Sequence, residues 1–410
     1  MRVGIEAINF YGGRTFLDVR GLFKARNLDL RRFDNLMIQR KSVALPCEDP
    51  VSFGINAAKP LLDQLNEEEK NRIELVVTGT ESGLDFGKSL STYLHDYLKL
   101  NRHCRLFEIK HACYAGTAAL QMAASLVAAN SSPGTKVLVI ATDIAKAAIK
   151  GSYVEPSQGA GAIAMLISDQ PEILEIDFGA NGYYSYEVMD SCRPTADIET
   201  GDSDLSLLAY LDCLEHSFMA YANRVEGADF VDTFDYLAFH TPFPGMVKGA
   251  HRTMMRKLKA APSTLSDADF ERRVRPSLAY CAEVGNIYSA TLYLALCSLI
   301  DSVDLPAPKR VGLYSYGSGC CAEFFSGILA ANAKVKLAGL HKGDSLKSRY
   351  ELSVQEYDNL LDQALEWPFG TRDKEVNTLA YQEIYDGVMA NQGLLVLRKI
   401  TNYHREYEWS

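Results

Sequence analysis

The sequence predicts an α/β protein in which apolar strands alternate with helices along the whole chain. Runs rich in β-branched residues, such as 73–79 and 136–143, alternate with segments of helical hydrophobic spacing, which is the pattern of an α/β architecture. No low-complexity tract or linker interrupts the alternation, and the second half loosely repeats the order of the first. We therefore expect a duplicated α/β/α/β/α sandwich with halves at residues 1–170 and 171–410.

After an expected first strand at residues 1–6, the first half contains four further expected strands and two expected helices. The strands are short apolar runs of the kind that a sheet buries on both faces. Residues 116–129 are nearly all small or apolar, so this helix is expected to be buried on most sides. Residues 84–98 are expected to form an amphipathic helix. The expected strands lie at 73–79, 106–109, 136–143 and 161–168.

The second half begins with an expected helix at 205–222, and a strand at 236–240 then ends at a histidine. A helix that carries several basic residues follows at 245–258, and a buried helix is expected at 286–300. Strands at 310–315 and 324–330 flank the sequence Tyr316-Gly317-Ser318-Gly319. Its two glycines predict a tight turn.

Composition and charge restrict the class of protein. The hydrophobic fraction of 47% and the charged fraction of 23% are those of a globular protein. A net charge of -10 argues against nonspecific nucleic-acid binding. Nine scattered cysteines without a Cys-x-x-Cys spacing fit a reduced cytosolic protein better than a disulfide framework or a zinc site. No apolar run approaches the roughly 20 residues that cross a bilayer, and the longest candidate is 288–300. We therefore expect neither a nucleic-acid partner nor a membrane.

Three reactive side chains follow three of the expected strands. Glu81 lies just after the strand 73–79, and Cys113 lies between the strand 106–109 and the helix 116–129. His240 ends the strand 236–240. A thiol, a carboxyl group and an imidazole form a complete set for acyl transfer followed by carbon–carbon bond formation.

Each of the three residues has a catalytic and a structural interpretation. Cys113 is the expected nucleophile, because a helix N-terminus lowers the pKa of a neighbouring thiol. A partly desolvated Glu81 would remove a proton from a methyl group, and His240 would polarise or protonate a ketone oxygen. The structural alternatives are a buried cysteine, a solvated loop glutamate and a core histidine. The presence of all three together favours catalysis.

Two further segments are expected to support these residues. Asn286, at the start of the expected helix 286–300, can hydrogen-bond to His240 or to a substrate carbonyl, and Tyr288 follows it in the same stretch. The backbone N–H groups of Ser318 and Cys113 are expected to form an oxyanion hole for an acyl thioester.

These motifs resemble those of the 3-hydroxy-3-methylglutaryl (HMG) synthase family of the thiolase superfamily, over essentially the whole chain. The resemblance implies a thiolase-like fold, a homodimer, Glu81 as general base and acid, and Cys113 as the acyl carrier. It matches His240 with the family's histidine, Asn286 with its Gly-Asn-x-Tyr motif and Ser318 with its Gly-Ser-Gly turn. Decarboxylating ketosynthases of the same fold share the cysteine, histidine and asparagine but not this glutamate motif.

Within that family the chain is most similar to the bacterial synthases of polyketide β-branching, by the stretches 183–194, 201–207 and 240–256. Gly245 and Gly249 stand where mevalonate-pathway enzymes carry lysines for the phosphates of coenzyme A. The resemblance thus implies an acetyl donor and a β-ketoacyl acceptor, each on the phosphopantetheine of an acyl carrier protein. It implies no permanently bound cofactor, no metal and a bacterial cytoplasmic location. The stretch 141–157 is shorter than the family pattern.

An acidic enzyme needs a local basic patch to meet an acidic carrier protein. Two clusters are candidates: Arg31, Arg32, Arg40 and Lys41, and then Lys248, His251, Arg252 and Arg256, which fall at helical spacing. Three other functions stay open. They are an HMG-CoA synthase that uses acetyl-CoA and acetoacetyl-CoA, a decarboxylating ketosynthase, and a non-catalytic thiolase-fold partner that only docks carrier proteins.

Overall fold

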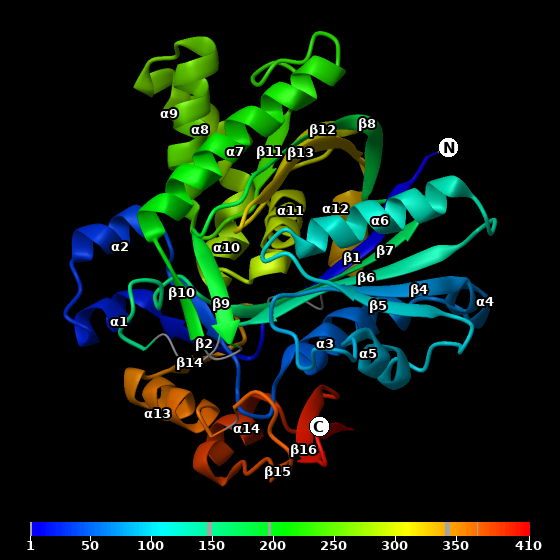
Figure 1. Cartoon of the computed structure of the whole chain (residues 1–410), viewed down its shortest axis with the longest axis vertical. Coiled ribbons are helices and arrows are strands. Elements are labelled where there is room, and N and C mark those ends of the chain that lie inside the picture. Colours follow the sequence, from blue (N-terminus) through cyan, green and yellow to red (C-terminus); the bar gives the residue numbers. More distant parts are fainter. Residues whose placement is uncertain (1, 146–149, 196–197, 341–344, 367) are drawn as a thin grey trace.

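The computed structural model describes residues 2–145, 150–195, 198–340, 345–366 and 368–410, and one mixed sheet runs through its centre (Figure 1). The strand order is β11-β12-β13-β8-β1-β7-β6-β4-β5. In chain order these strands are β1 (Gly4–Tyr11), β4 (Ile73–Gly79), β5 (Arg105–Ile109), β6 (Lys136–Ile144), β7 (Ala160–Ser168), β8 (Leu174–Ser185), β11 (Tyr236–Phe239), β12 (Lys309–Gly317) and β13 (Cys321–Leu329).

Helices cover both parts of this sheet and create a layered structure. On the outer faces, α3 (Pro50–Leu62) packs on β1, β6 and β7, and α7 (Ser203–Arg224) packs on β8, β12 and β13. Between the two parts lie α6 (Ala115–Ala129) and α11 (Thr291–Ser302), which share one hydrophobic core (Figure 1). The predicted α/β sandwich is confirmed.

The expected boundary near residue 170 falls between β7 and β8. Both of these strands pair with β1, so the sheet continues across that point. The division of the chain into halves stays a prediction.

The central helix α6 buries one apolar face against the sheet and leaves another face exposed, so the expectation of burial on most sides was wrong. It packs on β4, β6 and β7, and Ala115, Ala119, Ala123 and Ala124 are fully buried, whereas Met122 and Ser125 are exposed. By length and composition alone, the segment Ala112–Ala129 is the one described helix that would also pass as a membrane span. The expectation that the longest apolar run lies at 288–300 was therefore wrong. The packing of one face of α6 against the sheet is typical of a core helix in an α/β fold.

Two expected helices are shorter than the sequence predicts. Within 84–98 only α5 (Ser91–Tyr97) is helical, because the Asp85 carboxylate accepts hydrogen bonds from the N–H groups of Gly87 and Lys88 and holds a turn there. The helix expected at 286–300 starts as a 3-10 turn, Tyr288–Ala290, and becomes α11 only at Thr291. Tyr288 has a left-handed φ of 50°, which a regular helix cannot contain.

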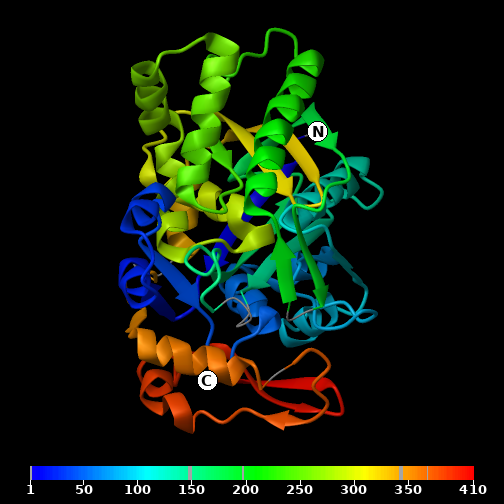
Figure 2. The same ribbon diagram turned by 60° about the vertical axis from the view of Figure 1, so that its left-hand side comes forward.

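Several elements lie outside the expected pattern. Small sheets are formed by β2 (Thr15–Asp18), β3 (Arg40–Val43) and β14 (Tyr350–Leu352), and by the hairpin of β9 (Ser191–Thr195) and β10 (Ile198–Gly201). A C-terminal unit contains α13 (Val354–Ala364), α14 (Gln382–Val388), β15 (Lys374–Glu375), β16 (Leu395–Thr401) and β17 (His404–Trp409), and Figure 2 shows it below the body. The remaining helices are α1 (Val19–Ala25), α2 (Leu30–Leu36), α4 (Glu67–Asn71), α8 (Pro244–Lys259), α9 (Ser263–Arg273), α10 (Ala279–Val284) and α12 (Ala333–Leu340).

Candidate active site

Parallel strands deliver the predicted site residues to a shared edge of the sheet. Strand β4 pairs in parallel with both β5 and β6, so Glu81, Cys113 and Asp143 all lie near the carboxyl ends of neighbouring strands. Strands β11 and β12 are also parallel, which places His240 and Ser318 just beyond the ends of another such pair. Carboxyl ends of parallel strands are where α/β folds build their binding sites.

Close backbone contacts then bring the two groups of strands together. A Cβ at Gly317 would lie 2.7 Å from the carbonyl oxygen of His111, so the turn of Ser318 lies directly against the segment that carries Cys113. A Cβ at Gly116 would lie 2.2 Å from the carbonyl oxygen of Ser289. Only glycine fits at either position. The segments that the sequence singles out are therefore in mutual contact.

Asp143 fixes the geometry of the Glu81 loop, and sequence reasoning assigned it no role. Its fully buried carboxylate accepts hydrogen bonds from the backbone N–H groups of Glu81 and Ser82 through one oxygen, at 2.9 and 3.0 Å. The other oxygen accepts from the N–H and the hydroxyl of Ser289, at 3.0 and 2.5 Å. One carboxylate thus joins the end of β4 to the turn before α11.

The thiol of Cys113 faces the carboxylate of Glu81. The Cys113 Sγ donates to Glu81 Oε2 at 3.7 Å, and 14% of the Glu81 side chain is exposed. Burial raises the pKa of Glu81 to about 8, against the lowering effect of Arg193. Burial, reinforced by the negative charges of Glu81 and Asp143, also raises the pKa of Cys113 well above its usual value.

The expected lowering of the Cys113 pKa by a helix N-terminus was therefore wrong. Helix α6 begins only at Ala115, and the neighbouring carboxylates oppose ionisation of the sulfur. The raised pKa favours the neutral thiol, and Glu81 is the carboxyl group that this thiol contacts.

Arg193, on β9, is a functional candidate that the sequence did not reveal. Its Nη2 atom lies 3.1 Å from Glu81 Oε1 and 3.2 Å from Glu199 Oε2. Its guanidinium also lies over the ring of Tyr288, 4.9 Å from the ring centroid. The arginine stabilises the ionised form of Glu81 and holds that carboxylate in place. No local sequence pattern around residue 193 predicts this role, because the contact depends on how the β9–β10 hairpin packs over the site.

His240 is buried, with 2% of its surface exposed. Its backbone is fixed by hydrogen bonds, since its N–H donates to Tyr314 and its carbonyl oxygen accepts from the Tyr210 hydroxyl. The Nδ1 atom has no hydrogen-bond partner among the described residues. Burial lowers the pKa of His240 to about 3, so the imidazole is neutral at neutral pH. The neutral ring can donate or accept one hydrogen bond at a substrate oxygen, but it does not carry the extra proton of an imidazolium acid.

Asn286 and Tyr288 are positioned differently from one another. The Asn286 Oδ1 atom accepts from the N–H of Tyr288 and the hydroxyl of Thr291, so its Nδ2 amide is the group available to a substrate. The expected bond between Asn286 and His240 is not among those of the described residues. The Tyr288 hydroxyl is buried and has no partner within the described ranges. An unpaired buried hydroxyl is costly unless a ligand completes it.

Of the first docking cluster, Arg31 and Arg32 lie on α2, which packs against α8, the helix of the second cluster, whereas Arg40 and Lys41 lie on β3. However, Lys41 and His251 are buried, and His251 is bound to Asp269, so neither belongs to the surface. The remaining positions are largely paired or stacked. Arg31 pairs with Asp29, Arg40 pairs with Glu283, Lys248 and Arg252 share Asp267, Arg32 lies over the ring of Tyr153, and Arg256 is exposed.

Comparison with known proteins identifies the family. Family models described as hydroxymethylglutaryl-coenzyme A synthase, N terminal and C terminal, match residues 1–172 and 251–385. The polyketide biosynthesis 3-hydroxy-3-methylglutaryl-ACP synthase PksG of Bacillus subtilis (strain 168) is 52% identical over 418 residues, which covers 99% of each chain. The chain belongs to the HMG synthase family.

Two further comparisons place this HMG synthase among solved and characterised relatives. The crystal structure of the curacin biosynthetic pathway HMG synthase in complex with acetyl donor-ACP is 52% identical, with a TM-score of 0.97 and full coverage of both chains. The hydroxymethylglutaryl-CoA synthase of Enterococcus faecalis is 37% identical over 89% of this chain and 93% of that protein. The predicted family, the thiolase-like fold and the class of acyltransferase are confirmed.

Proposed function

We propose that this HMG synthase acts in polyketide β-branching. It takes an acetyl group from an acyl carrier protein and condenses it with the β-ketone of a polyketide on a second carrier protein. The similarity to PksG, a 3-hydroxy-3-methylglutaryl-ACP synthase, and to the curacin enzyme in complex with acetyl donor-ACP supports the carrier-protein assignment. The contact between Cys113 and Glu81 is the observation that carries the chemistry.

In the first step, the Cys113 sulfur attacks the donor thioester while the Glu81 carboxylate accepts the thiol proton. Burial raises the pKa of Glu81 to about 8, which makes its carboxylate a stronger base toward the thiol than an exposed glutamate. The pantetheine thiol leaves with a proton, and an acetyl thioester remains on Cys113. The backbone N–H groups of Cys113 and Ser318 would hold the oxyanion.

In the second step, Glu81 removes a proton from the acetyl methyl group, and the resulting enolate attacks the β-ketone of the acceptor. The ketone oxygen becomes an alkoxide that needs hydrogen-bond donors. His240, the Asn286 amide and the Tyr288 hydroxyl are the proposed donors, because each keeps a polar atom without a hydrogen bond to the described residues. The proton that neutralises the alkoxide comes from Glu81 or through His240.

In the third step, water hydrolyses the Cys113 thioester and leaves a β-hydroxy-β-carboxymethyl acyl group on the acceptor carrier protein. The substrates remain on phosphopantetheine throughout. The proposed steps need no metal or redox cofactor, because a thioester α-proton is acidic enough for a positioned carboxylate. We further propose that the protein is a cytoplasmic homodimer with thiolase-like halves at 1–170 and 171–410.

The position of Gly245 weighs against the alternative in which coenzyme A is the acetyl carrier. A Cβ there would lie 1.7 Å from the carbonyl oxygen of Asn35, so a phosphate-binding lysine has no room at this point of α8. Gly249 is exposed, and nothing lies within 4 Å of a Cβ at that position. A lysine would fit at 249, yet none is present.

Intact-mass spectrometry of the protein mixed with an acetyl-carrier protein, and separately with acetyl-CoA, tests this function. We expect rapid gain of one acetyl group on Cys113 from the carrier protein and slow gain from coenzyme A. Faster acetylation by coenzyme A would favour the mevalonate enzyme. Acetylation by neither donor would favour the non-catalytic docking partner.

Charge reversal at the proposed docking surface should separate the two donors. Arg32→Glu or Arg252→Glu should slow acetylation by the carrier protein roughly tenfold, since like charges at a docking surface reduce association. Acetylation by a small acetyl thioester should keep its rate. Arg398→Glu, an exposed arginine on β16 of the C-terminal unit, serves as the control. Equal slowing with both donors would argue against a docking role.

A further inference from the structure

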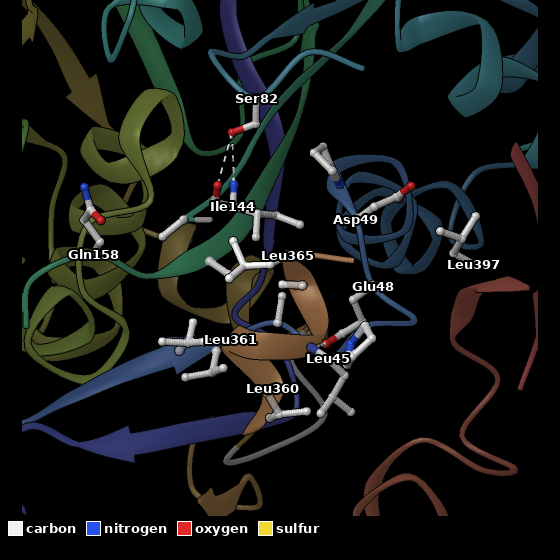
Figure 3. Close-up of a pocket in the computed structure, with 18 of the residues that line it drawn as sticks. Leu45, Glu48, Asp49, Ser82, Ile144, Gln158, Leu360, Leu361, Leu365 and Leu397 are labelled. Atoms are coloured by element: carbon white, nitrogen blue, oxygen red, sulfur yellow. Dashed lines mark hydrogen bonds between the residues drawn. The ribbon is translucent and has the colours of Figure 1, made fainter. Parts of the chain in front are cut away.

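A largely apolar cavity of about 260 Å³ lies between the body of the synthase and the C-terminal unit (Figure 3). Figure 3 shows Leu360 and Leu361 of α13, and Leu365 just after it, on the side opposite Ser82 and Ile144. Other apolar residues of the wall come from the end of β3 and the segment after it, among them Val43, Ala44 and Leu45. The proposed chemistry assigns this space no role.

The cavity shares its wall with the active site. Ser82 lines it and directly follows Glu81, and the Ser82 N–H is held by Asp143. Gln158 also lines it, and its Nε2 atom donates to Glu199 at 3.0 Å. Glu199 in turn pairs with Arg193, the partner of Glu81. A group in the cavity would therefore lie just behind the loop that carries the general base.

The wall of the cavity also contains a few polar atoms that can form hydrogen bonds with a ligand. Gln158 is 3% exposed, and its Oε1 atom has no hydrogen-bond partner in the described part of the chain. Lys41, which is buried and lines the same space, donates to the Glu155 carbonyl oxygen and the Tyr357 hydroxyl. An ammonium group has three donors, and its hydrogen bonds to described residues use two of them. Apolar walls with a few convergent polar groups are typical of a small-molecule site.

We propose that this cavity receives the acyl chain of the acceptor beyond its β-carbon, an alkyl chain that carries hydroxyl or other oxygen substituents. The inference rests on the proposed function, in which the β-carbon meets the acetyl group between Cys113 and Glu81. The pantetheine arm occupies one side of that carbon, so the rest of the polyketide must extend on another. The cavity approaches that site at Ser82, which follows Glu81, and at Gln158, and an acetoacetyl acceptor has no chain long enough to need it.

Substitutions that fill the cavity test this assignment. Leu361→Trp and Ala44→Leu add side-chain volume at its wall, and Asn359→Trp, on the exposed face of α13 outside the cavity, is the matched control. The acetylated protein is mixed with a carrier-bound acetoacetyl group or a carrier-bound β-ketododecanoyl group, and kcat/KM is measured for each. In both filled variants, kcat/KM for the long acceptor should fall roughly tenfold or more. They should keep the acetoacetyl rate and the rate of Cys113 acetylation.

The outcomes separate the cavity from the chemistry. The assignment is wrong if the filled variants keep the kcat/KM of the unsubstituted protein for the long acceptor. It is also wrong if their kcat/KM falls equally for both acceptors while acetylation is retained. If the unsubstituted protein fails to acetylate or to condense either acceptor, the proposed function fails first. Ala44→Leu, the smaller change, keeps the test decisive if Leu361→Trp also loses acetylation through misfolding.

Discussion

Replacement of Cys113 by alanine is expected to abolish acetylation by the carrier protein and with it all condensation. The sulfur forms the covalent bond to the acetyl group, and no neighbouring group can take its place: Glu81 is a base, and His240 is neutral and held by its backbone. Loss of a nucleophile of this kind lowers the rate by more than about four orders of magnitude. The measurement is intact mass after mixing with acetyl-carrier protein, with peptide mapping of the acetylated residue.

A matched cysteine substitution makes this result specific. Cys104 is partly exposed, as Cys113 is, but lies just before β5 rather than after it. Cys104→Ala should acetylate at the normal rate. Retained acetylation in Cys113→Ala would place the acyl group elsewhere and would contradict the assignment of the nucleophile.

The sequence predicted the fold and the shared location of Glu81 and Cys113 because both depend on local patterns. Buried strands correspond to continuous apolar runs in the sequence. The reactive residues follow those runs directly, at the carboxyl ends of β4, β5 and β11. Parallel pairing then brings residues at these ends together without any further information. Glu81 and Cys113 meet for this reason.

The parts that the sequence did not predict depend on contacts between distant segments. Arg193 reaches Glu81 from the β9–β10 hairpin, which is 112 positions further along the chain. The raised pKa of Cys113 arises from burial beside Glu81 and Asp143, whereas a helix N-terminus in isolation predicts the opposite direction. Lys41 and His251 were placed on the surface because basic spacing does not reveal which face of an element is covered.

Replacement of Glu81 by glutamine is expected to leave a protein that can be acetylated but that condenses extremely slowly. The amide cannot remove a methyl proton, so condensation should fall by about three to four orders of magnitude. Acetylation should suffer less, because loss of the negative charge lowers the pKa of Cys113, which Glu81 otherwise raises. Single-turnover condensation by the pre-acetylated protein measures the two effects separately.

The pH dependence identifies which carboxyl group is the base. Burial raises the pKa of Glu81 to about 8, so condensation by the unsubstituted protein should increase as the pH rises through that value and Glu81 loses its proton. Glu81→Gln should lack this rise. Glu323 is a second buried carboxyl group, bonded to the Tyr114 hydroxyl, and burial raises its pKa to about 7. A rise that survives in Glu81→Gln but disappears in Glu323→Gln would assign the base to Glu323, whereas the opposite pattern ties proton removal to the carboxylate that faces Cys113.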